Sequence, residues 1–283
     1  MIAQSYSPMD RIRGDSDHLR ARQRLGKYRI ERRLSQGGFA SVYQALDTIE
    51  GVRVALKMPH QFNVTASMLE AFQREARLVA RLDHPNILPL KDASFIEGRF
   101  VITSKLGEQT LADRLKKRVS LETSFSLIEQ MISAVAYAHE NKIIHCDIKP
   151  ENMILLPDGR LQLMDFGIAK VAQRTIVRTM IASGSGTVGY MAPEQAMGRP
   201  SARSDIFALG LLIYRVLAGV LPEWPFAWPP EGYATLRRKV APEMIVVIRK
   251  SLEMRPNRRY RDAGEMFRAF CPAKRKSLRR IAK

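Results

Sequence analysis

The sequence predicts an α+β fold in which a small β-rich lobe precedes a larger, mainly helical lobe. Residues 28–58 carry strand-like patterns, residues 67–82 repeat apolar side chains at helical spacing, and helical patterns dominate beyond residue 106. Strands therefore gather early in the chain and helices follow, which is the order typical of a sheet-rich lobe joined to a helical one.

The first lobe is expected to be an antiparallel meander with one helix. The strand-like runs are YRIERRL from Tyr28, SVYQALD, and VRVALKM ending at Met58, with a turn at TIEG (48–51) between the last two. The amphipathic run SMLEAFQREARLVARL (67–82) ends at HPN, and RFVITSKL (99–106) predicts one further strand.

Two apolar stretches predict long helices in the second lobe. They are SFSLIEQMISAVAYAHE (124–140) and IFALGLLIYRVLAGVL (206–221). The second has 16 residues and contains Arg215, so it falls short of the roughly 18 uncharged residues that a membrane span needs. We interpret it as a buried helix.

The pattern of the chain predicts one two-lobed domain between two basic segments. The expected divisions are an N-terminal extension at 1–26, the domain at 27–272 (N-lobe 27–103, hinge 104–106, C-lobe 107–272) and a C-terminal tail at 273–283.

Composition is that of a globular protein, with 46% hydrophobic and 26% charged residues among 283. The two cysteines, Cys146 and Cys271, are too few for a disulfide framework, and no apolar leader opens the sequence. These features predict a reducing, cytoplasmic setting. Neither the cysteines nor the five scattered histidines have metal-ligand spacing, so no structural metal is expected.

The net charge of +18 (46 basic minus 28 acidic residues) would suit a nucleic-acid or acidic-lipid partner. Residues 274–283 carry six basic residues and no acid, but the basic stretches lack the interleaved aromatic residues of single-strand binding platforms. We therefore expect mostly solvated surface and no specific nucleic-acid partner. A weak contact of the tail with an acidic surface or membrane stays open.

A glycine-containing turn separates the first two strands, at LSQGGFASV (34–42). Such a turn can lay backbone N–H groups over phosphates. Against the spacing G-x-G-x-x-G-x-V, Gly37 and Val42 match, whereas Ser35 and Ala40 replace glycines. Taken alone, the stretch could equally be an ordinary hairpin turn.

The third strand carries VALK (54–57), in which Ala55 and Lys57 share one face. Lys57 could bind phosphate oxygens if an anion held it in place, and Glu75, in the middle of the amphipathic helix, is the candidate. Singly, each could be a solvated surface residue.

HCDIKPEN (145–152) and DFG (165–167) supply the groups that phosphoryl transfer requires. These are a carboxylate to accept a hydroxyl proton, a cation for the moving phosphate and oxygen ligands for Mg²⁺. Asp147 supplies the carboxylate, Lys149 the cation, and Asn152 with Asp165 the metal ligands.

With GTVGYMAPEQ (186–195) and SDIFALG (204–210), the chain resembles the eukaryotic-type protein kinases over about residues 27–272, and most of all their bacterial members. The resemblance implies a bilobal protein-kinase-like fold, ATP as substrate with Mg²⁺, and protein Ser/Thr hydroxyls as acceptors in a signalling role. The D-x-K-x-x-N form around Lys149 is similar to the serine/threonine class.

The resemblance also implies a role for each matching position. Asp147 would be the catalytic base, Lys149 would neutralise the γ-phosphate, and Asn152 and Asp165 would hold Mg²⁺. The residues implied in nucleotide binding are Leu34, Ser35, Gly37, Gly38, Ala40, Val42, Ala55, Lys57, Glu75, Thr103 and Ile154.

Further positions would shape the site. Thr103 would be the gatekeeper behind the adenine, and Thr187 would line the acceptor pocket. Glu194 would pair with Arg259 to brace the segment that presents the substrate, and Asp205 would cap the catalytic loop.

Two departures from the family pattern bear on function. The replaced glycines put nucleotide affinity in question, which keeps a catalytically silent pseudokinase scaffold as the alternative; a small-molecule kinase and a nucleic-acid module are further rivals.

Cys146 stands where many kinases have an arginine that binds a phosphate on the activation segment. Because the Asp147 carboxylate disfavours a thiolate, we expect a small buried side chain there rather than a redox switch.

Overall fold

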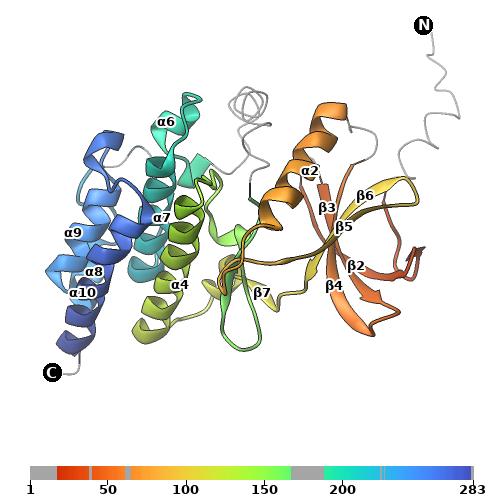
Figure 1. Ribbon diagram of the computed structural model, residues 1–283. Helices are drawn as coiled ribbons and strands as arrows, with labels where there is room; N and C mark the ends of the chain where they lie inside the picture. Colours follow the sequence, from red (N-terminus) through yellow and green to blue (C-terminus); the bar gives the residue numbers. More distant parts are fainter. Residues whose placement is uncertain are drawn as a thin grey trace, which may run out of the picture. The chain divides into compact units, whose positions relative to one another are not determined.

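The computed structural model describes residues 18–37, 40–60, 65–166, 188–223, 225 and 227–281. The chain divides into two compact units (Figure 1). The sheet unit comprises the chain up to Ala80 together with Pro89–Leu106, and the helical unit comprises Arg81–Leu88 and the chain from Gly107 onward.

The sheet unit is built on a six-stranded antiparallel sheet in the order β1-β2-β3-β4-β6-β5. Its strands are β1 (Arg24–Leu25), β2 (Tyr28–Gln36), β3 (Ala40–Asp47), β4 (Val52–Pro59), β5 (Leu90–Ile96) and β6 (Arg99–Lys105). The predicted meander, the turn at 48–51 and the strand at 99–106 are therefore present, and β1 and β5 are additions.

Alternation in β3 and β4 gives this sheet two distinct faces. Tyr43 on β3 and Val54 and Leu56 on β4 are almost fully buried in one apolar core. Residues between them in the sequence point to the opposite face, which is only partly buried. The predicted amphipathic helix is α2 (Ala66–Val79), and it begins where the Thr65 side chain accepts a hydrogen bond from the Met68 N–H.

The described part of the predicted N-terminal extension belongs to the sheet unit. Residues Arg24–Leu25 pair with Tyr28 and Arg29 of β2, and Leu19 and Leu25 are buried in the core. Residues 18–26 join the fold because these two leucines give them apolar surface to bury.

The helical unit contains the predicted long helices and several shorter ones (Figure 1). Its helices are α3 (Leu111–Arg114), α4 (Leu121–Glu140), α6 (Pro193–Ala196), α7 (Ala202–Ala218), α8 (Tyr233–Lys239), α9 (Pro242–Ser251) and α10 (Ala263–Ile281). The single turns of 3₁₀ helix are η2 (Pro150–Asn152), η3 (Val188–Tyr190) and η4 (Pro256–Arg258), and a small sheet joins β7 (Gln109–Thr110), β8 (Met153–Leu155) and β9 (Leu161–Leu163).

Helix α7 is the centre of this unit and packs against α4 and α9. It is buried from Ser204 to Ala218 apart from Arg215, as the apolar pattern predicts. It ends at Gly219, whose φ of 86° is the left-handed conformation that favours glycine as a helix terminator.

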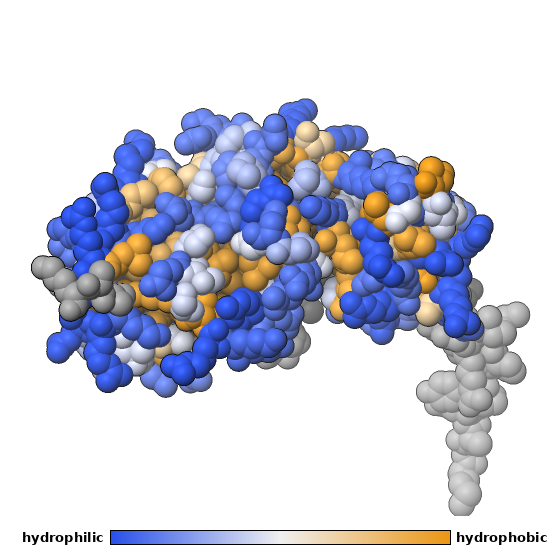
Figure 2. All heavy atoms as spheres, turned by 90° about the horizontal axis from the view of Figure 1, so that it is seen from below, coloured by the Kyte–Doolittle hydropathy of each residue, from blue (hydrophilic) through white to orange (hydrophobic). Residues whose placement is uncertain are grey.

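Helix α10 contains Pro272 and continues beyond it to Ile281, so the predicted boundary at 272/273 falls inside a helix. Its buried stripe, which includes Phe270, Ala273 and Ser277, runs past the proline and holds the last turns against the unit. Among the described residues, no helix combines the length and the hydropathy that crossing a membrane requires. On the face drawn in Figure 2, hydrophilic side chains predominate and apolar ones show between them.

Candidate active site

The loop between α4 and β8 holds HCDIKPEN, and His145 is its internal support. The His145 ring is fully buried, its Nε2–H donates to the Met164 carbonyl (2.9 Å), and its Nδ1 accepts the Asp147 N–H (3.2 Å). The Phe166 ring lies edge-on against it, at 4.8 Å between centroids. Because both ring nitrogens are occupied, His145 is a structural residue and has no free nitrogen to act as a base.

Asp205 of α7 binds the backbone of this loop. Its carboxylate accepts the N–H groups of His145 and Cys146, both at 2.8 Å, and it is 1% exposed. A third bond comes from the Nε2–H of His139, whose Nδ1 accepts the Ala263 N–H. The predicted capping of the loop by Asp205 is therefore present, with bonds to a charged acceptor that are stronger than neutral ones.

Cys146 occupies a strained backbone position. Its φ is +66°, a left-handed conformation that is costly for a residue with a side chain. The bond from its N–H to Asp205 and the bond that its carbonyl accepts from Gln195 Nε2 (2.6 Å) hold it there. The side chain is 4% exposed, in line with the expected small buried residue.

Asp147, Lys149 and Asn152 form one cluster. Asp147 Oδ2 accepts a hydrogen bond from Asn152 Nδ2 (2.7 Å) and lies 2.9 Å from Lys149 Nζ. Asn152 Nδ2 also donates to the Asp147 backbone carbonyl (2.8 Å). With 38% of its side chain exposed, the carboxylate is fixed through one oxygen and remains accessible to solvent.

Two oxygen donors near this cluster fit a magnesium ion. The Asn152 Nδ2 donates to two oxygens of Asp147, so the Asn152 Oδ1 points away from Asp147. Asp165 follows β9 and is partly exposed, with a φ of +65°. No group of three or more His, Cys, Asp or Glu suited to a metal occurs in the described parts of the chain. The pair fits an ion that takes its remaining ligands from phosphates and water, as Mg²⁺ usually does.

The sheet unit contains the predicted ion pair of Lys57 and Glu75. Lys57 Nζ lies 3.1 Å from Glu75 Oε1 and 3.4 Å from Oε2, and their side chains are 14% and 6% exposed. The ammonium group also lies 5.8 Å from the centroid of the Phe72 ring. This burial holds the Lys57 ammonium group in a defined position on the sheet.

Neighbouring predicted residues lie on the same sheet face as Lys57. Val42 pairs directly with Lys57, and Gln44 pairs with Ala55, so all four side chains point to one face. At the end of the hairpin the Gly37 N–H donates to the Ala40 carbonyl (2.8 Å). Among the described residues, that carbonyl is the one heavy atom within 4 Å of where a Cβ at Gly37 would lie, at 3.5 Å.

Leu34 and Ser35 precede this turn on β2, and both are exposed. Gly38, like Thr187 of the implied acceptor pocket, lies outside the described residues. Ile154, on β8 in the helical unit, is 8% exposed and packs with Leu88 and Leu156. The predicted nucleotide residues are thus divided between the two units.

Thr103 is not brought together with the other predicted nucleotide residues. It pairs with Leu56, whereas Ile102 pairs with Lys57, so Thr103 points to the opposite face of the sheet. It is fully buried there, and its hydroxyl donates to the Tyr28 hydroxyl (3.2 Å).

The predicted pair of Glu194 and Arg259 is a bidentate ion pair in the helical unit. The Nη1–Oε1 and Nη2–Oε2 distances are 2.7 and 3.0 Å, and the Ser204 hydroxyl donates to Oε1. Burial raises the pKa of the Glu194 carboxyl, but the bonds from Arg259 and Ser204 outweigh burial and leave the pKa below its usual range.

Several supporting residues escape sequence reasoning. His139 and Gln195 hold the catalytic loop through Asp205 and the Cys146 carbonyl, and His60 contacts the glycine-containing turn. His139 lies six residues before His145, but neither spacing nor composition distinguishes it from a solvated helix residue. Long-range hydrogen bonds of this kind leave no local pattern.

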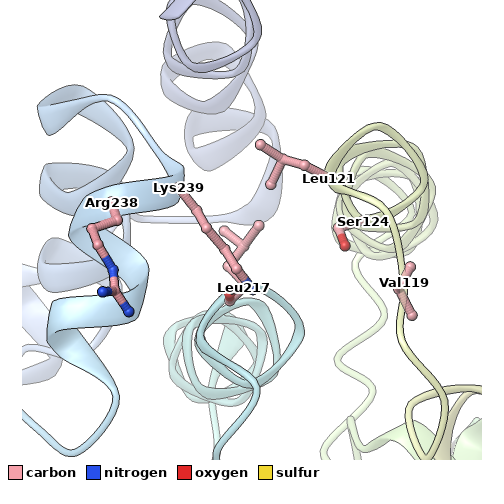
Figure 3. Close-up of a pocket in the computed structure, with 6 residues that line it drawn as sticks. All are labelled: Val119, Leu121, Ser124, Leu217, Arg238 and Lys239. Carbon is pink, nitrogen blue, oxygen red and sulfur yellow. Dashed lines mark hydrogen bonds between the residues drawn. The ribbon is translucent and has the colours of Figure 1, made fainter. Parts of the chain in front are cut away.

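A separate hollow of about 280 Å³ lies between α4, α7 and α8 (Figure 3). Its lining residues are Val119, Leu121, Ser124, Leu217, Arg238 and Lys239. None of these described lining residues carries a carboxylate, and the Ser124 hydroxyl and the Lys239 ammonium group donate to the carbonyls of Ser120 and Leu217. The hollow therefore contains none of the groups described above.

Known proteins are similar to this chain in both sequence and fold. The chain is 33% identical over 261 residues to the serine/threonine-protein kinase PknA of Mycobacterium tuberculosis, covering 84% of this chain and 59% of PknA. It is 36% identical over 202 residues to the serine/threonine-protein kinase PrkC of Bacillus subtilis, covering 70% of this chain and 31% of PrkC. The chain thus spans only part of these relatives.

Two solved structures match most of this chain. The kinase domain of Mycobacterium tuberculosis PknI matches with a TM-score of 0.69 and 25% identity, covering 90% of this chain and 100% of that one. The PpkA-294 apo form matches with a TM-score of 0.74 at 21% identity, also over 90% of this chain, which shows a common fold. The predicted bilobal kinase fold is confirmed. Because the protein kinase domain pattern matches residues 28–265, the chain belongs to the protein kinase family.

Proposed function

We propose that this chain is a serine/threonine protein kinase that transfers the γ-phosphate of ATP to Ser or Thr hydroxyls of proteins in a signalling role. The observation that carries the proposal is the Asp147 carboxylate, held through Oδ2 by Lys149 and Asn152 while it stays partly exposed. A general base must be held firmly and still be reached by the acceptor hydroxyl.

Each member of the cluster has a distinct task. Asp147 accepts the proton of the acceptor hydroxyl. Lys149 stands beside that carboxylate, where its positive charge also offsets negative charge that develops on the transferred group. Asn152 fixes the carboxylate through its Nδ2, so the base keeps one orientation as the acceptor approaches.

Each of the predicted nucleotide-binding residues has a proposed task. Lys57, positioned by Glu75, binds phosphate oxygens, and the glycine-containing turn at 34–42 is the part of the sheet unit that would cover them. Asn152 and Asp165 would hold Mg²⁺, which, when bound, neutralises phosphate charge. For the adenine, the resemblance implies contact with Ala55 in the sheet unit and with Ile154 in the helical unit.

Two features support a serine or threonine of a protein as the acceptor. Lys149 stands two residues after the catalytic aspartate, as in the serine/threonine class. The buried pair of Glu194 and Arg259 makes a rigid base for a peptide-presenting segment, which a kinase of small molecules does not need.

A catalytically silent scaffold is the alternative, and it rests on Ser35 and Ala40 in place of glycines. The test is to incubate the chain with labelled ATP, Mg²⁺ and a basic protein substrate, and to map the labelled residues. Label on Ser or Thr that disappears without Mg²⁺ is the expected result. ATP binding without any transferred label would favour the scaffold.

The outer stripe of α10 supports a weak second contact, with an acidic surface. Arg268, Arg275 and Arg279 recur at helical spacing opposite the buried stripe, and all three are exposed. Such a stripe attracts anionic lipid headgroups by about 1 kcal/mol per basic residue. Sedimentation with vesicles of anionic and of neutral lipid would test this contact, and equal binding to both would refute it.

ATP use and two free cysteines support a cytoplasmic setting.

A further inference from the structure

Gln195 connects helix α6 to the catalytic loop. It is 5% exposed, and its Nε2–H donates to the backbone carbonyl of Cys146 at 2.6 Å, across 49 residues of sequence. A short hydrogen bond from a buried amide therefore joins two segments of the helical unit that lie far apart along the chain.

The carbonyl that Gln195 binds belongs to the peptide unit directly before the proposed base. This unit consists of the Cys146 carbonyl and the Asp147 N–H, and the N–H donates to Nδ1 of His145 at 3.2 Å. Both polar groups of the unit are thus held, one by Gln195 and the other by His145. Because a peptide unit is planar, holding both groups fixes the plane from which the Asp147 side chain extends.

The peptide unit on the other side of Cys146 is held separately. The Cys146 N–H donates to Asp205 Oδ1 at 2.8 Å. The two units meet at the Cys146 Cα, where φ is +66°, and a residue with a side chain leaves this left-handed conformation when nothing holds it. A single anchor would leave the other unit free to rotate. Asp205 and Gln195 are therefore both needed to keep the conformation that leads into Asp147.

The α6 end of this connection is itself anchored. Glu194, next to Gln195, forms the bidentate ion pair with Arg259, at 2.7 and 3.0 Å. The hydroxyl of Ser204, in α7, also donates to Glu194, at 2.7 Å. Helix α6 is therefore tied to two other parts of the helical unit, and it gives the Gln195 side chain a fixed base.

We propose that Gln195 is a positioning residue for the catalytic base. It acts through the Cys146 carbonyl and holds the Asp147 carboxylate in the orientation that the acceptor hydroxyl meets. The position of the base thereby depends on α6, which belongs to the proposed peptide-presenting segment. The connection consists of a neutral amide and a backbone carbonyl, so it needs no charged side chain at Cys146. This inference rests on the proposed kinase function.

The test measures kcat and KM for a peptide, the Kd of ATP and Tm on purified variants. Gln195→Met keeps the length of the side chain but removes the donor. We expect kcat to fall by about tenfold or more, because the base leaves its productive position, while KM and the Kd of ATP stay within about threefold. A residue with a merely structural role would lower Tm without this selective loss of kcat.

Gln162→Met is the matched control. Gln162 is also 5% exposed and also donates through its Nε2 to a backbone carbonyl, that of Pro85 at 3.1 Å, within the same unit. Tm should fall in both variants, but kcat should fall only in Gln195→Met. If Gln195→Met fails to fold, Gln195→Asn replaces it, because the shorter side chain keeps the amide but places it out of reach of the carbonyl.

The Cys146 thiol gives a second readout that does not depend on catalysis. Cys146 is 4% exposed, so a thiol reagent labels it only when the loop opens. The other free cysteine, Cys271, is removed by Cys271→Ala. In that background Gln195→Met should speed labelling about tenfold, the effect of losing one hydrogen bond, and Gln162→Met should leave the rate unchanged.

The outcomes separate the two proposals. A wild type that transfers no phosphate would refute the kinase function and this inference with it. If the wild type transfers phosphate, the positioning role alone is refuted by unchanged kcat or unchanged labelling in Gln195→Met, or by equal losses of kcat in Gln195→Met and Gln162→Met.

Discussion

Replacing Asp205 by asparagine tests whether the clamp beneath the catalytic loop controls catalysis. The carboxylate accepts backbone N–H groups from His145 and Cys146 and the Nε2–H of His139. An asparagine has the same shape but only one acceptor oxygen, and its NH₂ group would face an N–H donor. At least one hydrogen bond to a charged acceptor is lost.

The expected magnitudes follow from these contacts. A hydrogen bond to a buried charged group contributes about 1.5–3 kcal/mol, so the free energy of unfolding should fall by about 2 kcal/mol. For a domain of this size that lowers Tm by about 4–8 °C. The left-handed Cys146 peptide would relax toward an ordinary conformation and carry Asp147 with it, and a shift of about 1 Å in a catalytic group can cost about 100-fold in kcat.

The assay measures Tm, kcat with a peptide, and the Kd of ATP for Asp205→Asn and for Asp47→Asn. Asp47 is a matched control because it is fully buried and accepts the N–H groups of Ile49 and Glu50, at the end of β3 remote from the glycine-containing turn. Both variants should lose stability, but only Asp205→Asn should lose kcat. Equal kcat values in the two variants would show that Asp205 is merely structural.

Three further outcomes are expected. Lys57→Met leaves Glu75 as a buried carboxylate without its ion-pair partner, so Tm should fall and the Kd of ATP should rise by tenfold or more; unchanged ATP affinity would remove Lys57 from the site. Thr103→Met should lower Tm, because it breaks the bond to Tyr28 and overpacks a full core. Because Thr103 points away from the face of Lys57, the variant should not act selectively on inhibitors that extend behind the adenine; a selective loss of such inhibitors would support the predicted gatekeeper role. Folding lowers the Glu194 pKa from its ordinary value of 4.5, so the carboxylate stabilises the fold above pH 4.5, and this contribution is lost as pH falls through the folded pKa. When the free energy of unfolding is measured with urea from pH 6 to pH 3, it should fall less steeply in Glu194→Gln than in the wild type. An equal fall in both proteins would contradict this role of Glu194.

Local patterns were sufficient to predict much of the fold. Alternation places Tyr43 and Leu56 in the core and Lys57 on the other face, and the apolar run of α7 predicts burial that the structure has. The motif letters also identify Asp147, Lys149 and Asn152, which meet because a single short loop carries all three.

Features that depend on distant contacts could not be read in this way. The register of β4 with β6, which decides the face of Thr103, depends on how two strands 40 or more residues apart align, and one residue of slip reverses the face. The roles of His60, His139 and Gln195 depend on partners 23 to 66 residues away. A single side chain in the sequence carries no sign of such a partner.

We infer that Asp147 is the base of a phosphoryl transfer, and measuring turnover together with ATP binding tests this role. Steady-state phosphorylation of a peptide and equilibrium binding of ATP are measured on the same preparations of wild type and Asp147→Asn. We expect kcat to fall by about 100-fold or more, because general-base catalysis contributes about 10²–10⁴-fold, while the Kd of ATP stays within about threefold because no phosphate anchor is lost. A variant that keeps more than about a tenth of the wild-type kcat would show that Asp147 is not the base.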